Sequence, residues 1–209
     1  MSNAIAMNIQ LVTLDGRYVR LEPLSLKHLP NLCEGGLDPE LWRWTTTIVR
    51  THDEMKRYIE EALLQQQNGT ALPFVTIERS SAKAIGSTRF GNIDRGHRRV
   101  EIGWTWVMRP WERTPVNMEA KYLMLKHAFE MLGCIRVEFK TDSLNGPSRA
   151  ALLRIGAKEE GLLQNHMVTY SGRIRHTVYY SMIDSEWPFI KKRLEEKLAQ
   201  PFNRIAVNR

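Results

Sequence analysis

The 209-residue chain is long enough to bury one full hydrophobic core, and its composition requires no second domain. Its net charge of +7, from 30 basic and 23 acidic residues, favours a polyanionic partner such as a phosphorylated cofactor, or else only keeps the surface soluble. No basic run or aromatic motif typical of nucleic-acid binding occurs, and no apolar run is long enough to span a membrane. The two cysteines, Cys33 and Cys134, lack metal-ligand spacing, so we expect no metal site, no disulfide framework and a cytoplasmic location.

The chain is expected to form one α/β domain over residues 7–200. Residues 1–6 are interpreted as an expression leader or a disordered N-terminus, with Met7 as the native start, and residues 201–209 as a loose tail.

In the first half, the Asp15-Gly16 turn precedes an alternating strand, and Thr51 stands three residues before Glu54 in the spacing of a capping box. The aromatic segment 41–45 is irregular, and packing against the core is its simplest interpretation. The elements expected here are a strand at 17–21, a short helix at 26–33, a helix opening at 51, strands at 72–78 and 84–90, and a turn at 92–98.

The segment 100–130 organises the rest of the chain. Residues 100–107 are β-branched and aromatic, which indicates a buried strand, and from Asn117 the apolar residues recur at helical spacing. The alternating strand 135–140 follows, so the three elements form a βαβ unit with two parallel strands. Asn145 is a candidate N-cap for a short helix at 148–155. Strands at 158–170 and 175–183 complete a mixed sheet of about seven strands, and a helix at 186–198 follows.

The loop between the strand and the long helix is a candidate anion site. Backbone N–H groups at a helix start have no intrahelical partner, and Arg109 and Arg113 add positive charge. Neither the glycine fingerprint of a dinucleotide site nor the Gly-Lys-Ser/Thr of a P-loop is present. These observations favour the pyrophosphate of a coenzyme such as CoA.

At this point the chain resembles the GNAT acetyltransferase superfamily, and within it the ribosomal-protein N-terminal alanine acetyltransferases. The segments that carry the resemblance follow one another in the family's order at residues 14–21, 85–87, 100–104, 116–121, 127–130, 145–152 and 155–161. The resemblance implies a single GNAT-like domain whose mostly antiparallel sheet has one splayed parallel pair and helices on both faces. It also implies acetyl-CoA as co-substrate and a primary amine as acceptor, either a peptide N-terminus or a small molecule.

Laid on this sequence, the resemblance assigns the cofactor to three places. The pantetheine arm would pair with the strand at Trp106, Val107 and Met108. The pyrophosphate would lie on the loop and first helical turn, at Arg113, Thr114, Val116, Asn117 and Met118, and Asn145 and Ser148 would contact the pantetheine or thioester. Pro115 departs from the family, which usually has glycine there, and removes one N–H donor. Arg109 and Arg113 are expected to offset that loss.

Two residues are candidates for the chemistry. The usual tyrosine acid of the family is replaced by Leu152, and Ser148, which matches the hydroxyl proposed in the ribosomal-protein branch, is the alternative acid as well as a candidate helix cap. Glu101 on the central strand is the candidate general base, although a strand glutamate is more often ion-paired. Trp42, Trp44 and Arg89 are candidate walls of the acceptor site.

Three functions remain open at this stage. The first is acetyl transfer by direct attack in a ternary complex, since no cysteine lies at the candidate site to form a covalent intermediate. The second is a non-catalytic CoA-binding or ribosome-associated module, and the third is a small-molecule amine acetyltransferase. Nucleic acid would be a partner only through a ribosomal substrate, and the long C-terminal strands and helix could mediate a homodimer.

Overall fold

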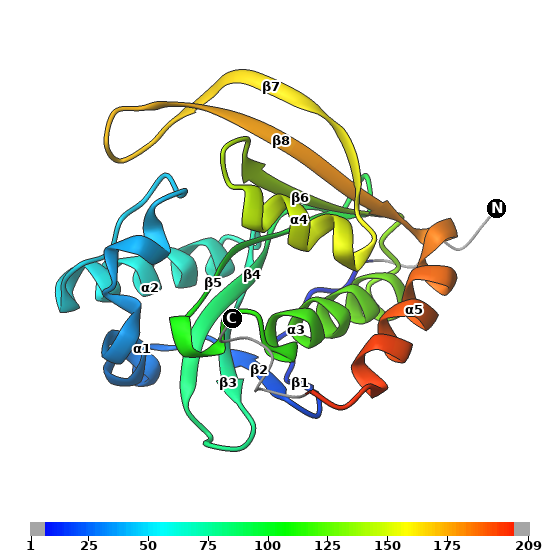
Figure 1. Ribbon diagram of the computed structural model, residues 1–209, viewed down its shortest axis with the longest axis horizontal. Coiled ribbons are helices and arrows are strands. Elements are labelled where there is room, and N and C mark those ends of the chain that lie inside the picture. The colour runs from blue at the N-terminus through cyan, green and yellow to red at the C-terminus, as the bar shows by residue number, and fades with distance from the viewer. Residues whose placement is uncertain (1–6, 203–209) are drawn as a thin grey trace.

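The structure is a computed structural model that describes residues 7–202, so the segment predicted at 1–6 and most of the predicted tail lie outside the described residues. One eight-stranded sheet organises the fold, in the order β1-β2-β3-β4-β5-β6-β8-β7 (Figure 1). Its strands are β1 (Leu14–Asp15), β2 (Val19–Pro23), β3 (Leu72–Glu78), β4 (Ala84–Asp94), β5 (Arg99–Val107), β6 (Arg136–Asp142), β7 (Lys158–Val168) and β8 (Ile174–Ile183). The predicted fold class is confirmed; the strand beyond the expected seven is β1, which pairs with β2 across the Asp15-Gly16 turn.

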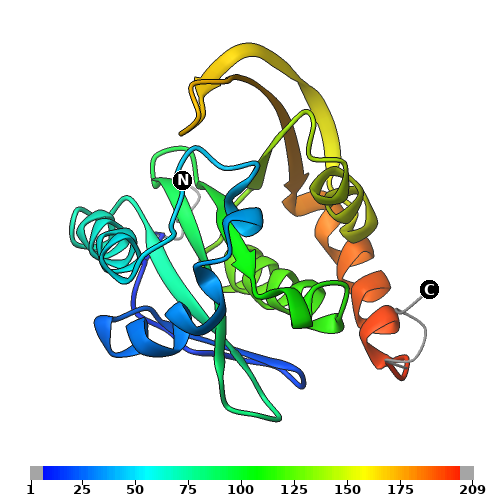
Figure 2. The same ribbon diagram turned by 60° about the vertical axis from the view of Figure 1, so that its left-hand side comes forward.

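Helices cover both faces of this sheet (Figure 2). They are α1 (Leu29–Gly36), α2 (His52–Gln67), α3 (Pro115–Lys126), α4 (Gly146–Ile155) and α5 (Trp187–Ala199). One core lies between the sheet and α3, α4 and α5, and a second lies between the sheet and α1 and α2. The predicted capping box at Thr51 and Glu54 opens α2, where the Glu54 N–H donates to Thr51 Oγ1 at 3.2 Å.

The parallel pair predicted from the βαβ unit is present but short. Residues Arg99–Glu101 of β5 pair with residues Arg136–Glu138 of β6, and the pairing of these two strands ends there. β5 and β4, in contrast, stay paired as far as Val107. The second half of β5 therefore has a strand neighbour on one side only. Between Ser87 and Arg89 of β4 the register with β5 shifts, and Trp104 opposite has a φ of +49°, so the strand bulges where it leaves β6.

Helix α3 begins two residues earlier than its apolar stripe predicted, because Thr114 caps it and Pro115 fits the first helical position. Its Glu119 carboxylate accepts backbone N–H groups of Arg17, Tyr18 and Val19 at 2.8, 2.6 and 2.8 Å. These bonds join the helix to the β1–β2 turn.

The hairpin of β7 and β8 forms a long arm that arches over α4 and β6 (Figure 1). β8 pairs with β6 from Thr177 to Ile183, but every residue of β7 is exposed. The tip of the arm approaches the loop between α1 and α2, where Arg175 Nη1 donates to the Trp44 carbonyl at 3.5 Å. This contact joins the arm to the α1–α2 loop.

Candidate functional site

Glu101 lies at the point where β5 and β6 separate. Its side chain is buried, and its carboxylate accepts from Asn92 Nδ2 at 2.7 Å and pairs with Lys140 Nζ at 2.7 Å. Burial works against the charge of Lys140, but the bonds to Glu101 and Tyr179 raise its pKa overall. Gly103 leaves room for this carboxylate, since a Cβ there would lie 3.0 Å from Glu101 Oε1. The sequence expectation of a strand glutamate in an ion pair is met, and the partner Lys140 was not foreseen.

More charged groups line the same region from β6 and β8. The buried Asp142 pairs with Arg173, whose guanidinium also lies over the Trp44 ring at 5.8 Å. Burial lowers the pKa of Arg175, an effect that the nearby Asp142 and Glu101 carboxylates oppose. Each carboxylate in this group therefore has a cation beside it. Trp44, a predicted wall residue, contacts both Arg173 and Arg175 in this group.

The predicted wall residues Arg89 and Trp42 lie deeper. Arg89 is buried, and its guanidinium lies between the rings of Tyr58 and Trp104, at 5.1 and 5.0 Å from their centroids. Its Nη1 donates to Gln65 Oε1 at 3.1 Å, and it has no carboxylate partner within residues 7–202. Trp42 belongs to the second core, against the rings of Tyr58 and Trp106.

The loop before α3 has the features of an anion site. Arg113 is exposed, has a φ of +57°, and forms no ion pair or side-chain hydrogen bond within the described part of the chain. Arg109, in contrast, is held by Asp38 at 2.6 Å. The Thr114 hydroxyl donates to the Trp111 carbonyl at 2.7 Å and accepts from the Val116 N–H at 3.4 Å. The next N–H group, on Asn117, is the last one in the first turn without an i−4 carbonyl inside the helix.

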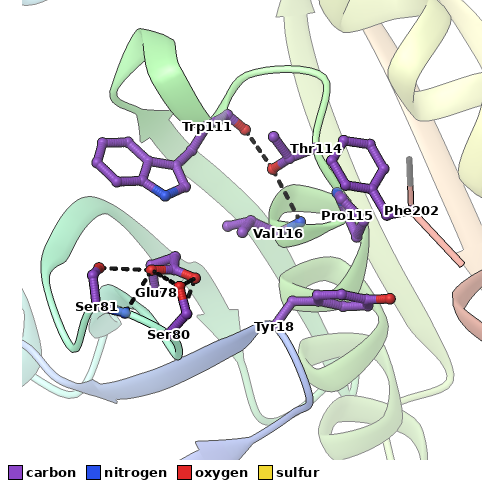
Figure 3. A pocket seen from close by; sticks show the side chains of 9 residues that line it. All are labelled: Tyr18, Glu78, Ser80, Ser81, Trp111, Thr114, Pro115, Val116 and Phe202. Atoms are coloured by element: carbon purple, nitrogen blue, oxygen red, sulfur yellow. Dashed lines mark hydrogen bonds between the residues drawn. The ribbon is translucent and has the colours of Figure 1, made fainter. Parts of the chain in front are cut away.

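A pocket of about 290 Å³ adjoins this loop (Figure 3). It lies between the β3–β4 turn, the β1–β2 turn and the start of α3, and Figure 3 shows Thr114, Pro115 and Val116 along one of its sides. On the opposite side the Glu78 carboxylate accepts from the hydroxyls of Ser80 and Ser81. Burial opposes the charge of Glu78, but these hydrogen bonds lower its pKa to about 2.

The remaining cofactor candidates differ in whether their backbone groups already have hydrogen-bond partners within the fold. Met108 uses both backbone groups within the fold, because its N–H donates to the Ile85 carbonyl at 2.8 Å and its carbonyl accepts from Trp111. Trp106 and Val107 are left as the strand residues for pairing with a pantetheine arm. At the start of α4, the Asn145 side chain accepts the Ser148 N–H at 3.1 Å, so Asn145 is the N-cap as predicted, and the expectation that Ser148 caps the helix was wrong because Ser148 lies three residues further into it. Ser148 itself is half-buried.

Lys121 is a polar residue of this region that sequence reasoning missed. It projects from α3 under the sheet, is 7% exposed, and its ammonium donates to Thr105 Oγ1 at 2.5 Å and Thr88 Oγ1 at 3.4 Å. Burial lowers its pKa to about 7. Its position beside Met124 and Leu125 on the helix wheel was the available signal, because it puts a lysine on the apolar face.

Within residues 7–202 no cluster of metal-binding side chains occurs. No helix in this part of the chain is long and apolar enough to cross a membrane.

Comparison with known proteins places this geometry in context. A family model described as an acetyltransferase (GNAT) domain matches residues 19–158. The uncharacterized N-acetyltransferase p20 of Bacillus licheniformis is 26% identical over 179 residues, covering 84% of this chain and 98% of that protein. The crystal structure of a GCN5-related N-acetyltransferase from Brucella melitensis superposes with a TM-score of 0.88 at 30% identity, covering 98% of this chain and 94% of the other. Mycobacterium smegmatis RimJ in complex with CoA-disulfide shares the fold, with a TM-score of 0.75 at 23% identity over 90% of this chain and 93% of that one.

Proposed function

Since the chain belongs to the GNAT acetyltransferase family and is an N-acetyltransferase, we propose that it transfers the acetyl group of acetyl-CoA to a primary amine by direct attack in a ternary complex. The observation that supports this most is the free edge of β5 beyond Glu101, which leads to the open first turn of α3. An extended pantetheine arm can pair with such an edge, and a pyrophosphate suits the N–H groups and the unpaired Arg113 at its end. The relative with bound CoA-disulfide, at the level of fold, is consistent with this cofactor.

The residues would divide the chemistry as follows. Trp106 and Val107 would hold the pantetheine, and the Thr114 to Met118 turn the pyrophosphate. Ser148 and Asn145 would approach the thioester from α4, with Ser148 donating a hydrogen bond to the departing sulfur. Glu101 would take a proton from the acceptor ammonium through a water, because its direct partners are Lys140 and Asn92. The amine would then attack the acetyl carbon.

The acceptor is proposed to be a peptide N-terminus. The β7–β8 arm and the α1–α2 loop meet at Trp44, through Arg173 and Arg175, and an extended chain that entered beside this contact could reach the free edge of β5. A polycationic small molecule would need unpaired carboxylates, whereas Glu101 and Asp142 are each paired with a cation.

Turnover of acetyl-CoA with a panel of N-terminal peptides and small amines tests the proposal, with Glu101→Gln and Ser148→Ala in parallel. We expect a peptide to be the best acceptor and kcat to fall about 10²-fold in Glu101→Gln, the usual size of a general-base effect. Binding of acetyl-CoA without thiol release for any acceptor would refute the assignment of this site. Unchanged kcat in both variants would remove the proposed roles of both residues.

A further inference from the structure

Lys121 is a buried cation that forms no ion pair with any of the residues that the structure describes. Its ammonium touches two hydroxyls, those of Thr88 on β4 and Thr105 on β5, and these hydroxyls are 2.7 Å from each other. Met124 of the same helix adds a sulfur contact to Thr88 at 3.7 Å. No carboxylate forms an ion pair with Lys121 within residues 7–202. Burial is the cause that lowers its pKa. An unpaired buried ammonium is costly, so its presence under the sheet calls for a role.

Thr105 connects this amine to the outside. It lies on the part of β5 that has left β6, immediately before Trp106, and it is exposed although its hydroxyl is in contact with Lys121. The register shift beside Trp104 displaces the strand at this point. In the proposed arrangement the pantetheine runs along Val107 and Trp106 away from the α3 turn. The thioester sulfur then arrives next to Thr105, between the cofactor segment and Glu101.

We propose that Thr105 and Lys121 form a relay that delivers the proton required by the departing CoA thiolate, an inference that rests on the proposed function. The acceptor nitrogen bonds to the acetyl carbon, the carbon–sulfur bond breaks, and the electron pair leaves with sulfur. Sulfur takes the proton of the Thr105 hydroxyl, which takes one from the Lys121 ammonium. The neutral Lys121 amine regains a proton from solvent, into which the acceptor nitrogen has released its own. Thr105 would contact the reacting sulfur, and Lys121 acts through it as a positioning residue.

The energetics of this relay are favourable. A lysine of pKa about 7 is a stronger acid than an ordinary alkyl thiol, whose pKa is about 8.5, so the transfer to sulfur is downhill. The Ser148 hydroxyl has no hydrogen bond to an ionisable side chain within residues 7–202 that could return a proton to it. Ser148 would therefore donate a hydrogen bond to the sulfur without supplying the proton. The relay would thereby replace the acid that is missing at Leu152.

The variants Thr105→Val, Thr105→Ser, Lys121→Met and Lys121→Arg test the relay, with the exposed Lys126→Met as matched control. We expect kcat to fall about 10²-fold in Thr105→Val and Lys121→Met, with KM for acetyl-CoA nearly unchanged, while Thr105→Ser and Lys126→Met stay near wild type. In wild type, kcat should fall as the pH rises above about 7, because Lys121 loses the proton that the relay delivers. This fall should be absent in Thr105→Val and Lys121→Met. Lys121→Arg keeps the charge but is a poor proton donor, so it should stay slow. Wild-type kcat in Lys121→Arg or Thr105→Val would overturn the relay. If Lys121→Met does not fold, the comparison of kcat between Thr105→Val and Thr105→Ser still tests the relay.

A second readout is independent of turnover. The bound CoA thiol, titrated by the ultraviolet absorbance of its thiolate, should ionise at lower pH in wild type and Lys126→Met than in Lys121→Met and Thr105→Val. Equal thiol titration in all four proteins would overturn the relay even if the enzyme acetylates amines. A lowered thiol pKa in an enzyme that acetylates no amine would support the relay chemistry and refute the proposed function.

Discussion

The carboxylate of Glu119 is expected to be among the most sensitive positions for stability. It is 5% exposed and accepts three backbone N–H groups from the β1–β2 turn, which together tie the turn to α3. In Glu119→Gln the retained carbonyl can replace Oε2, which accepts from Tyr18 and Val19, but the amide group cannot accept from Arg17. Losing the charge and one acceptor should cost about 2–4 kcal/mol of the free energy of unfolding, since hydrogen bonds to charged groups contribute about 1.5–3 kcal/mol each.

Urea and thermal unfolding followed by circular dichroism measure this loss. For a chain of this size the Glu119→Gln variant should melt roughly 4–16 °C lower, at about 2–4 °C per kcal/mol. Glu112→Gln is the control, because Glu112 is exposed in the loop just before α3 and should change stability by less than about 0.5 kcal/mol. Gly16→Ala should show a similar defect, because a Cβ there would lie 2.4 Å from Glu119 Oε2. Equal stability of Glu119→Gln and Glu112→Gln would refute the reasoning.

Three further predictions concern the cofactor loop, the cysteines and the buried lysine. Arg113→Ala should weaken CoA binding about 10-fold by calorimetry, and Arg109→Ala less, because Arg109 is paired with Asp38 whereas Arg113 has no ion pair among residues 7–202; equal effects would contradict this. A thiol reagent should modify the half-buried Cys33 in the native protein, but Cys134 only after unfolding, because Cys134 is buried and its burial raises its pKa to about 12. Rapid labelling of both cysteines in the native protein would contradict the burial of Cys134. Burial lowers the pKa of Lys121 from 10.5 to about 7. Between pH 7 and pH 10.5 the unfolded chain therefore binds more protons than the folded protein, and the free energy of unfolding rises with pH by up to about 1.4 kcal/mol per pH unit. Urea unfolding at a series of pH values should show this slope in wild type but not in Lys121→Met.

The fold could be predicted largely because its signals are local. The capping box at Thr51, the Asn145 cap, the strand 72–78 and the change from strand to helix period after Val107 each depend on residues close in sequence. The βαβ unit then determines that β5 and β6 are parallel. The extent of that pairing is not local, because it depends on the bulge at Trp104 and on how β8 inserts next to β6.

The candidate site residues came from the resemblance, and their contacts with residues distant in sequence were missed. Glu101 was named, but its partner Lys140 lies on a strand that follows a whole helix. Arg175 meets Trp44 across 131 positions, which no spacing pattern reveals. Lys121 stood inside a helical stripe, where sequence alone does not distinguish a buried amine from one that reaches solvent.

The most direct test of the central claim measures thiol release and peptide acetylation in the same reaction of wild-type enzyme, acetyl-CoA and the best N-terminal peptide. Direct attack in a ternary complex predicts one free thiol for each N-acetyl peptide found by mass spectrometry, initial-rate lines that intersect when both substrates are varied, and no acetylated protein intermediate. Thiol release without acetylated peptide, or parallel initial-rate lines with an acetyl group trapped on the enzyme, would contradict the account.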